Sequence, residues 1–183
     1  MQPGSDGPDI QPTGEDRQDG STSDLPKNGA PDVANPLDAS MLRDQPCKAV
    51  TDQQAEKLPG KLSDTATRKD GCVWSYDGDL FRLGAINGDL EVDNPEGLSS
   101  YYGDFDDDDT KVNPVDPIKG YPAIYFDIGT QDPGNCVIKV GIRNSLVYTS
   151  HAVLDSEHPS YDEPCEVARE FTEIAIENLK EAQ

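Results

Sequence analysis

Hydrophobic and polar positions alternate over several short stretches between residues 72 and 154, a pattern that predicts β-strands. The expected strands cover 72–76, 80–86, 89–92, 121–128, 136–143 and 146–154. In the stretch 136–143, "CVIKVGIR", the two-residue period separates a core face from a wetter face: Cys136, Ile138, Val140 and Ile142 against Val137, Lys139 and Arg143.

Turn dipeptides suggest how these strands connect. Asp77-Gly78, Asn87-Gly88 and Asn144-Ser145 each fall between two predicted strands, and Asn-Gly is a strong hairpin signal. We therefore expect an antiparallel meander over 72–92. In 121–128 we expect two opposite faces: Ile124, Phe126 and Ile128 on one, and Tyr121, Ala123 and Tyr125 on the other.

Helical signals lie before and after the strands. Thr51 followed by Gln54 has the spacing of a capping box, and Pro59-Gly60 would end that short helix. Residues 164–181 form the second helix, with one apolar stripe: Val167, Ala168, Phe171, Ile174, Ala175 and Leu179. We expect a poorly ordered connection over 61–71. A long surface loop with one helical turn at 98–102 should cover 94–120.

The predicted fold class is α+β: one antiparallel sheet of about five strands, with an N-terminal and a C-terminal helix on one face. Residues 1–36 are rich in Gly, Pro, Ser and Asp and contain no aromatic side chain, so we expect a disordered polar tether. Residues 37–183 would form the folded domain.

Charge excludes some partners. The chain has 36 acidic and 15 basic residues, a formal net charge of −21, and no cluster of Lys and Arg. Phosphate contacts need such clusters, so we do not expect nucleic acid or an anionic membrane surface as a partner. The sequence has no apolar run of membrane-spanning length, and we expect that Met1 replaces an export signal.

The four cysteines indicate the compartment. Cys47, Cys72, Cys136 and Cys165 are well separated, form no C-x-x-C pair and are accompanied by only two histidines, which disfavours zinc. Two disulfides and an oxidising compartment are expected instead. Of the three possible pairings we favour Cys47–Cys72 and Cys136–Cys165, because each would join neighbouring elements and staple a helix to the sheet.

Taken in order, these motifs resemble a family of actinobacterial extracytoplasmic lipoproteins classed as a domain of unknown function. The matching features are "PCKAVTDQQAEKL", the Cys72-x-Trp74 strand, Gly120 to Ala123, residues 136–141 and a helix that begins at Cys165. The resemblance implies export, a two-disulfide fold and a lipid anchor on the outer face of the cytoplasmic membrane. The lipidated cysteine of that family is absent from this chain, and the resemblance implies no catalytic residue.

The acidic run "GDFDDDDTK" is a weak candidate for a cation site. Asp104, Asp106 and Asp108 occupy the first, third and fifth positions of an EF-hand-like loop. Asp109 stands where that loop needs Gly, and Val115 where it needs Glu. A solvated acidic loop is therefore expected, with no bound metal and no cofactor.

No catalytic arrangement is recognisable. The cysteines are assigned to bridges, and His151 and His158 lie in no known catalytic motif. Pairs of carboxylates arise by chance among 36 acidic residues and therefore identify nothing.

Aromatic side chains are the better candidates for a binding surface. Tyr101, Tyr102 and Phe105 lie beside the acidic run, and Tyr121 and Tyr125 share a strand face. If that face is uncovered, the five would form an aromatic patch; the alternative is that the tyrosines pack under the long loop.

We therefore expect a monomeric, non-enzymatic domain that binds a ligand or protein at the cell envelope. The alternatives are an envelope hydrolase that uses paired carboxylates, and a cation-responsive module built on Asp104–Asp109.

Overall fold

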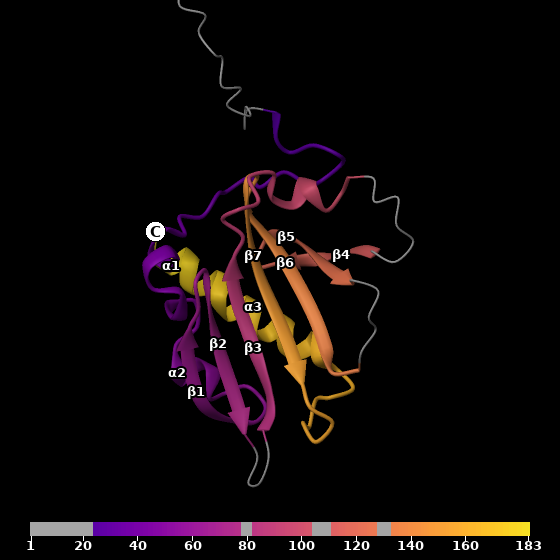
Figure 1. Ribbon diagram of the computed structural model, residues 1–183. Coiled ribbons are helices and arrows are strands. Elements are labelled where there is room, and N and C mark those ends of the chain that lie inside the picture. The colour runs from indigo at the N-terminus through magenta and orange to yellow at the C-terminus, as the bar shows by residue number, and fades with distance from the viewer. Residues whose placement is uncertain (1–23, 78–81, 104–110, 128–132) are drawn as a thin grey trace, which may run out of the picture.

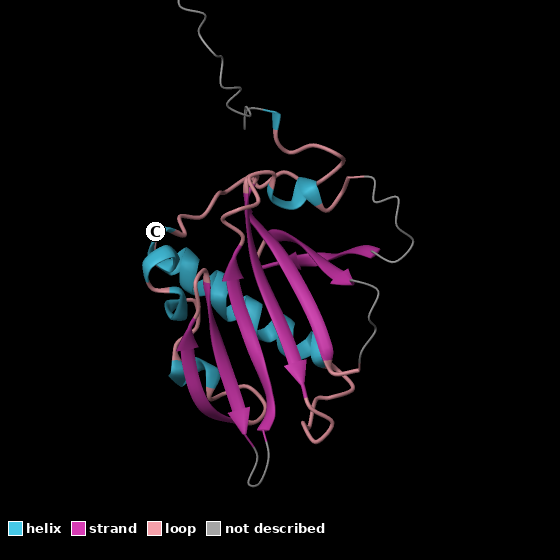
Figure 2. Ribbon diagram, in the orientation of Figure 1, coloured by secondary structure: helices cyan, strands magenta, loops and turns pink. Residues whose placement is uncertain are grey.

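A computed structural model describes residues 24–77, 82–103, 111–127 and 133–183, in which a seven-stranded antiparallel sheet has a long helix on one face (Figures 1 and 2). The strand order is β1-β2-β3-β7-β6-β5-β4. The α+β class and the single antiparallel sheet are confirmed, but the expected number of about five strands was wrong. The strands are β1 Lys61–Thr67, β2 Gly71–Asp77, β3 Arg82–Leu90, β4 Lys111–Ile118, β5 Tyr121–Asp127, β6 Asn135–Arg143 and β7 Leu146–Leu154.

The two strands that the pattern missed, β1 and β4, are the edges of the sheet. They had been assigned to a poorly ordered connection and to a surface loop. An edge strand buries little, so its sequence does not need a strict apolar alternation. β4 also contains Pro114 and Pro117, which edge strands tolerate because one side of the backbone has no partner strand.

The predicted hairpin at Asn87-Gly88 was wrong. Both residues lie inside β3, where Asn87 pairs with Val73 of β2 and with His151 of β7. A Cβ atom at Gly88 would lie 2.3 Å from the hydroxyl of Tyr148, so this glycine makes room for a large side chain. The strand therefore continues to Leu90, and no separate strand at 89–92 follows.

The helix α3, Pro164–Glu181, covers one face of the sheet and forms the core with it (Figure 1). Its buried side chains include five of the six predicted ones, with Ile174 partly buried, and add Thr172 and Ile176. Trp74 of β2 lies edge-on to Phe171, with ring centroids 4.8 Å apart. Trp74 is therefore a core residue, fully buried beneath the helix.

The N-terminal helices are short. They are α1, Ser40–Asp44, and α2, Asp52–Ala55, with a 3₁₀ helix between them at Pro46–Lys48. The capping box of Thr51 and Gln54 is present, although the helix ends at Ala55, before Pro59-Gly60. A second 3₁₀ helix, Gly97–Ser100, lies close to the predicted turn at 98–102.

Both favoured disulfides are present. Cys47–Cys72 ties the N-terminal 3₁₀ helix to β2, and Cys136–Cys165 ties β6 to the first turn of α3. The described ranges contain no free cysteine.

Contacts with the domain begin before residue 37. Ala30 and Val33 are buried, and the backbone N–H of Lys27 donates to the hydroxyl of Ser99. These residues belong to the stretch 1–36 assigned above to the tether. Residues 1–23 lie outside the described ranges.

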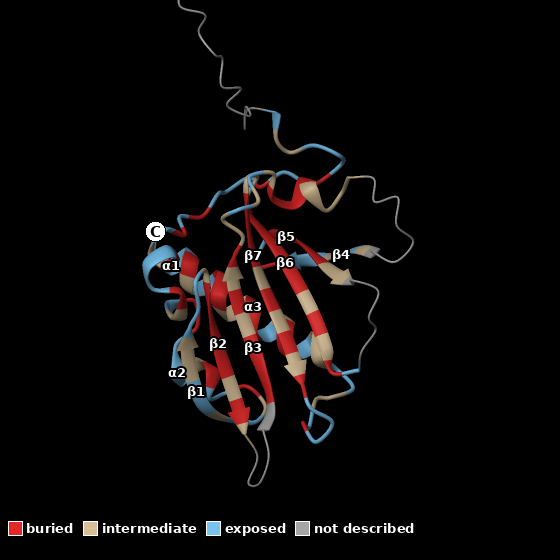
Figure 3. Cartoon of the chain, in the orientation of Figure 1, coloured by how far each residue is buried: buried red, intermediate tan, exposed pale blue. Residues whose placement is uncertain are grey.

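On the face of the sheet opposite α3, the described ranges place the 3₁₀ helix Gly97–Ser100 against β6 and β7. Figure 3 shows buried and half-buried residues alternating along the second half of β7, whereas β2 and β6 contain continuous buried runs. We refer to this side as the outer face.

Candidate functional site

The predicted aromatic patch is divided between the two faces of the sheet. Tyr121 and Tyr125 lie on the helix side, where Tyr121 is 6% exposed and donates its hydroxyl to the Asn35 carbonyl. Tyr101 and Tyr102 instead pack on the outer face with Ile124, in a small second cluster. The assumed orientation of β5 was therefore inverted, and the four described tyrosines of the predicted patch form no continuous surface.

Other predicted candidates lie outside the described ranges. These are Phe105 and the acidic residues Asp104, Asp106 and Asp108. Within the described ranges, no three His, Cys, Asp or Glu side chains are grouped so that they could hold a metal ion.

Lys139 provides the centre of a polar cluster that the pattern did not predict. It was assigned to the wetter face of β6, but it is only 7% exposed. Its ammonium forms an ion pair with Glu91, which follows β3, and lies over the rings of Tyr101 and Phe126 at 4.5 and 5.0 Å from their centroids. The aliphatic part of a lysine side chain can be buried in this way when its charge is paired.

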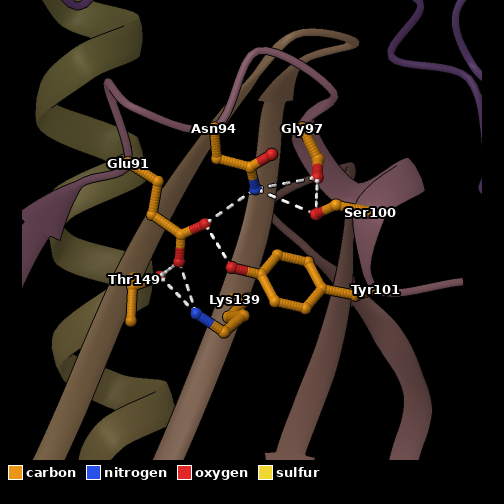
Figure 4. Close-up of polar contacts among 7 residues, drawn as sticks. All are labelled: Glu91, Asn94, Gly97, Ser100, Tyr101, Lys139 and Thr149. Atoms are coloured by element: carbon orange, nitrogen blue, oxygen red, sulfur yellow. Dashed lines mark hydrogen bonds and ion pairs between the residues drawn. The ribbon is translucent and has the colours of Figure 1, made fainter. Parts of the chain in front are cut away.

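Glu91 accepts hydrogen bonds from several elements, as Figure 4 shows. Thr149 and Tyr101 donate their hydroxyls at 2.5 Å, and Asn94 donates its amide at 3.1 Å. Burial alone would raise the pKa of Glu91, but the Lys139 charge and these hydroxyl hydrogen bonds hold that pKa below its ordinary value. We call these residues, Glu91, Asn94, Tyr101, Lys139 and Thr149, the Glu91 network.

The Glu91 network fixes the segment 91–101 against the sheet. Asn94 also donates to the carbonyl of Gly97 and to the hydroxyl of Ser100, at the 3₁₀ helix. Burial and the neighbouring Glu91 carboxylate raise the pKa of Tyr101, so its hydroxyl stays protonated and continues to donate. The segment that follows β3 is thereby held in one position.

This segment forms one wall of a cavity of about 360 Å³. The other walls are α1 with the residues before it, and the turn from β6 to β7. We call it the arginine cavity; it is lined by Asp38, Ala39, Ser40, Arg43, Val92, Pro95, Arg143, Ser145 and Leu146.

Backbone contacts bring these distant segments together. The N–H of Leu37 donates to the Ile142 carbonyl at 2.9 Å, and that of Val33 donates to the side-chain oxygen of Asn144 at 2.9 Å. The chain before α1 therefore runs beside the β6–β7 turn. This arrangement places Arg43 of α1 and Arg143 of β6 on the same cavity.

The two arginines differ in their contacts. Arg143 donates its Nε–H to the Leu37 carbonyl at 2.7 Å and lies 3.7 Å from the Asp38 carboxylate. Hydrogen bonds from the Ser40 backbone and hydroxyl, with the Arg143 charge, lower the pKa of Asp38 and keep it ionised. The Arg43 side chain forms no hydrogen bond or ion pair within the described part of the chain.

The outer face also carries polar side chains away from this cavity. Asp89 is half-buried, and burial together with nearby Asp70 and Glu91 raises its pKa. His151 lies 3.3 Å from the Asn135 side chain, and burial together with Lys139 lowers its pKa. None of the contacts of His151 joins it to a serine or cysteine nucleophile.

Arg43, Arg143, Asp38 and Glu91 were not among the predicted site residues. The chain contains six arginines, and nothing in the local pattern distinguishes the two that meet. Lys139 within an apolar strand was the one available signal, because a charge there needs either water or a partner.

None of the helices in the described ranges has the length and hydropathy that a membrane crossing requires.

The comparison with protein families agrees with the expected membership of a domain of unknown function. Searches of the curated proteins and of the solved structures gave no significant match. The family model described as "Protein of unknown function (DUF3558)" matches residues 2–178. Because this match spans nearly the whole chain, the protein belongs to that family.

Proposed function

We propose that this protein is a non-enzymatic binding domain of the cell envelope, and that the arginine cavity binds a small anion. The observation that carries the proposal is the meeting of Arg43 and Arg143 in one cavity. Acidic residues outnumber basic ones by 36 to 15, so a cavity wall with two guanidinium groups and one carboxylate departs from the rest of the chain.

The chemistry of the cavity favours an oxyanion. A guanidinium group is planar and presents several N–H donors that match a carboxylate or a phosphate. The Arg43 side chain is exposed and has no partner in the described part of the chain, so its donors are open to a ligand. Ser145 adds a hydroxyl to the same wall.

The cellular setting rests on the cysteines. Two disulfides are consistent with an oxidising compartment outside the cytoplasm. The resemblance to actinobacterial lipoproteins adds a lipid anchor ahead of the tether, and the domain would act there as a monomer.

The two alternative functions have less support. Asp38 is the one carboxylate on the cavity wall, and its hydrogen bonds go to Ser40. A glycosidase-type mechanism needs two carboxylates on either side of the bond that is cleaved. The loop of the cation-responsive hypothesis lies outside the described residues.

Titration of the isotope-labelled protein with acetate and with inorganic phosphate at low salt tests the proposal. Backbone NMR signals of residues 38–43 and 143–146 should shift in a saturable way. Arg43→Gln should weaken the binding about tenfold, the range of one hydrogen bond to a charged group. Arg68→Gln is the matched control, because Arg68 is exposed and lies outside the cavity wall.

Two results would contradict the proposal. One is the absence of saturable shifts around the cavity with either anion. The other is equal binding by the wild type, Arg43→Gln and Arg68→Gln, which would place the anion elsewhere.

A further inference from the structure

We infer that the anion is an amphiphile with a single negative charge, in which a carboxylate is attached to a short apolar group. This inference rests on the proposed function and specifies its ligand. It follows from the charges on the wall, from the apolar part of the wall and from the size of the cavity.

The charges on the wall favour a monoanion. Arg43 and Arg143 supply two positive charges and Asp38 supplies one negative charge, which leaves a net charge of one positive. Asp38 receives two hydrogen bonds from Ser40, at 2.9 and 3.1 Å, so its negative charge is part of the wall. A doubly charged phosphate ester would bring an excess negative charge next to this carboxylate.

Four of the six remaining lining residues are apolar, and the other two are Ser40 and Ser145. Ala39 and Leu146 are buried, Val92 is half-buried, and Pro95 is exposed, so the apolar surface runs from the core out to the rim. No charged side chain from the segment 92–95 lines the cavity. An inorganic ion would leave this surface in contact with water, whereas an alkyl group would cover it.

The size of the cavity limits the ligand. At roughly 30 Å³ for each water-sized group, a volume of about 360 Å³ holds on the order of ten non-hydrogen atoms. A carboxylate with about four to six further carbons would fill that space. A long acyl chain would extend beyond it.

The apolar wall is held by the Glu91 network. Val92 directly follows Glu91, and Pro95 directly follows Asn94, whose amide donates to Glu91 and to Gly97. The network therefore holds Val92 and Pro95 in the cavity wall before any ligand arrives, which lowers the ordering cost of binding.

At an envelope the competing source of a monoanion is the phosphodiester headgroup of a membrane lipid, in which glycerol groups and not a short alkyl chain flank the charge. The experiment therefore has two arms. The first is an NMR titration with acetate, butyrate and hexanoate. The second is co-sedimentation with phosphatidylglycerol vesicles, with phosphatidylcholine vesicles as the neutral comparison.

In the first arm, each added methylene should tighten binding about three- to fourfold, from the transfer free energy of a buried methylene, until the cavity is full. Val92→Thr should reduce this gain, because it replaces an apolar wall group by a hydroxyl of similar size. Val153→Thr is the matched control, on β7 and outside the cavity wall.

Each outcome decides the inference. A chain-length gain that Val92→Thr reduces supports it and assigns a free carboxylate. Arg43-dependent sedimentation with phosphatidylglycerol, without a chain-length gain, overturns the inference and leaves an anion site. Acetate binding without any chain-length gain and without vesicle binding overturns the inference and leaves the proposed function standing. Failure of every anion overturns both.

Discussion

At the scale of single residues, Lys139 shows how the surroundings of a side chain override its place in a pattern. The two-residue period assigned it to the wetter face of β6, and the side chain does lie on the outer face. It is nevertheless buried, because the segment 91–101 folds over this part of the sheet and brings Glu91 and Tyr101 to it.

Replacing Lys139 by Met should lower the free energy of unfolding by about 3 kcal/mol, because it leaves the Glu91 carboxylate buried without its cation. Chemical denaturation at pH 7 measures this loss. Lys27→Met is the control: the Lys27–Glu96 pair is more than 40% exposed on both sides, so its loss should cost at most about 1 kcal/mol.

The effect of Lys139→Met should also depend on pH. The pKa of Glu91 is lowered in the folded protein, so its stabilising contribution is complete above its ordinary value of 4.5 and is lost as the pH falls through the folded value. The difference between the wild type and Lys139→Met should therefore shrink in acid. A difference that is equal at pH 7 and in acid would contradict an electrostatic role.

At the scale of elements, β3 shows why the strongest turn signal in the sequence did not form a turn. Asn-Gly favours a hairpin because both residues tolerate positive φ, but Gly88 instead lies in the strand beneath α3. Trp74, Tyr148 and Phe171 converge above it, and its missing side chain lets the helix pack closely on the sheet.

Gly88→Ala should therefore destabilise the protein by about 1–3 kcal/mol through overpacking. Adding Tyr148→Phe should recover part of this loss, because the hydroxyl is the nearest atom and has no hydrogen-bond partner in the described part of the chain. Thermal or chemical denaturation of the single and double variants measures both effects.

Gly103→Ala is the control for this pair, since a Cβ there would meet only the flexible end of Asn28, at 3.3 Å. It should change the stability by less than about 0.5 kcal/mol. If Gly88→Ala is as mild as this control, the glycine is not needed for helix packing.

At the scale of the whole molecule, the two disulfides join the N-terminal segment and α3 to opposite parts of one sheet. They close loops with sequence separations of 25 and 29 residues. The loop-entropy model assigns about 3.5 kcal/mol to each, and thus about 7 kcal/mol to both. Domains of this size have total stabilities of about 5–15 kcal/mol, so the two bridges account for a large share.

Reduction of both bridges should therefore leave the domain marginally stable or unfolded. Circular dichroism melts with and without a thiol reductant should show a transition at much lower temperature, or none, in the reduced chain. An unchanged melting curve, with four free thiols confirmed by mass spectrometry, would remove the physical reason for placing this protein in an oxidising compartment.

Much of the architecture followed from local sequence patterns. The capping box at Thr51, the stripe of α3, the strands β2, β6 and β7 and both disulfide pairs could be predicted, because periodicity, cap chemistry and turn residues act over a few positions. The edge strands β1 and β4 could not, since an exposed strand carries little of that pattern.

The candidate site depended on tertiary structure alone. Which face of β5 packs into the core with α3, why Gly88 lies in a strand and how Lys139 is paired are decided by segments distant in sequence. The same is true of Arg43 and Arg143, which meet because the chain before α1 binds along the end of β6. A local pattern records period and turn chemistry, whereas a binding cavity is made by side chains that the fold brings together.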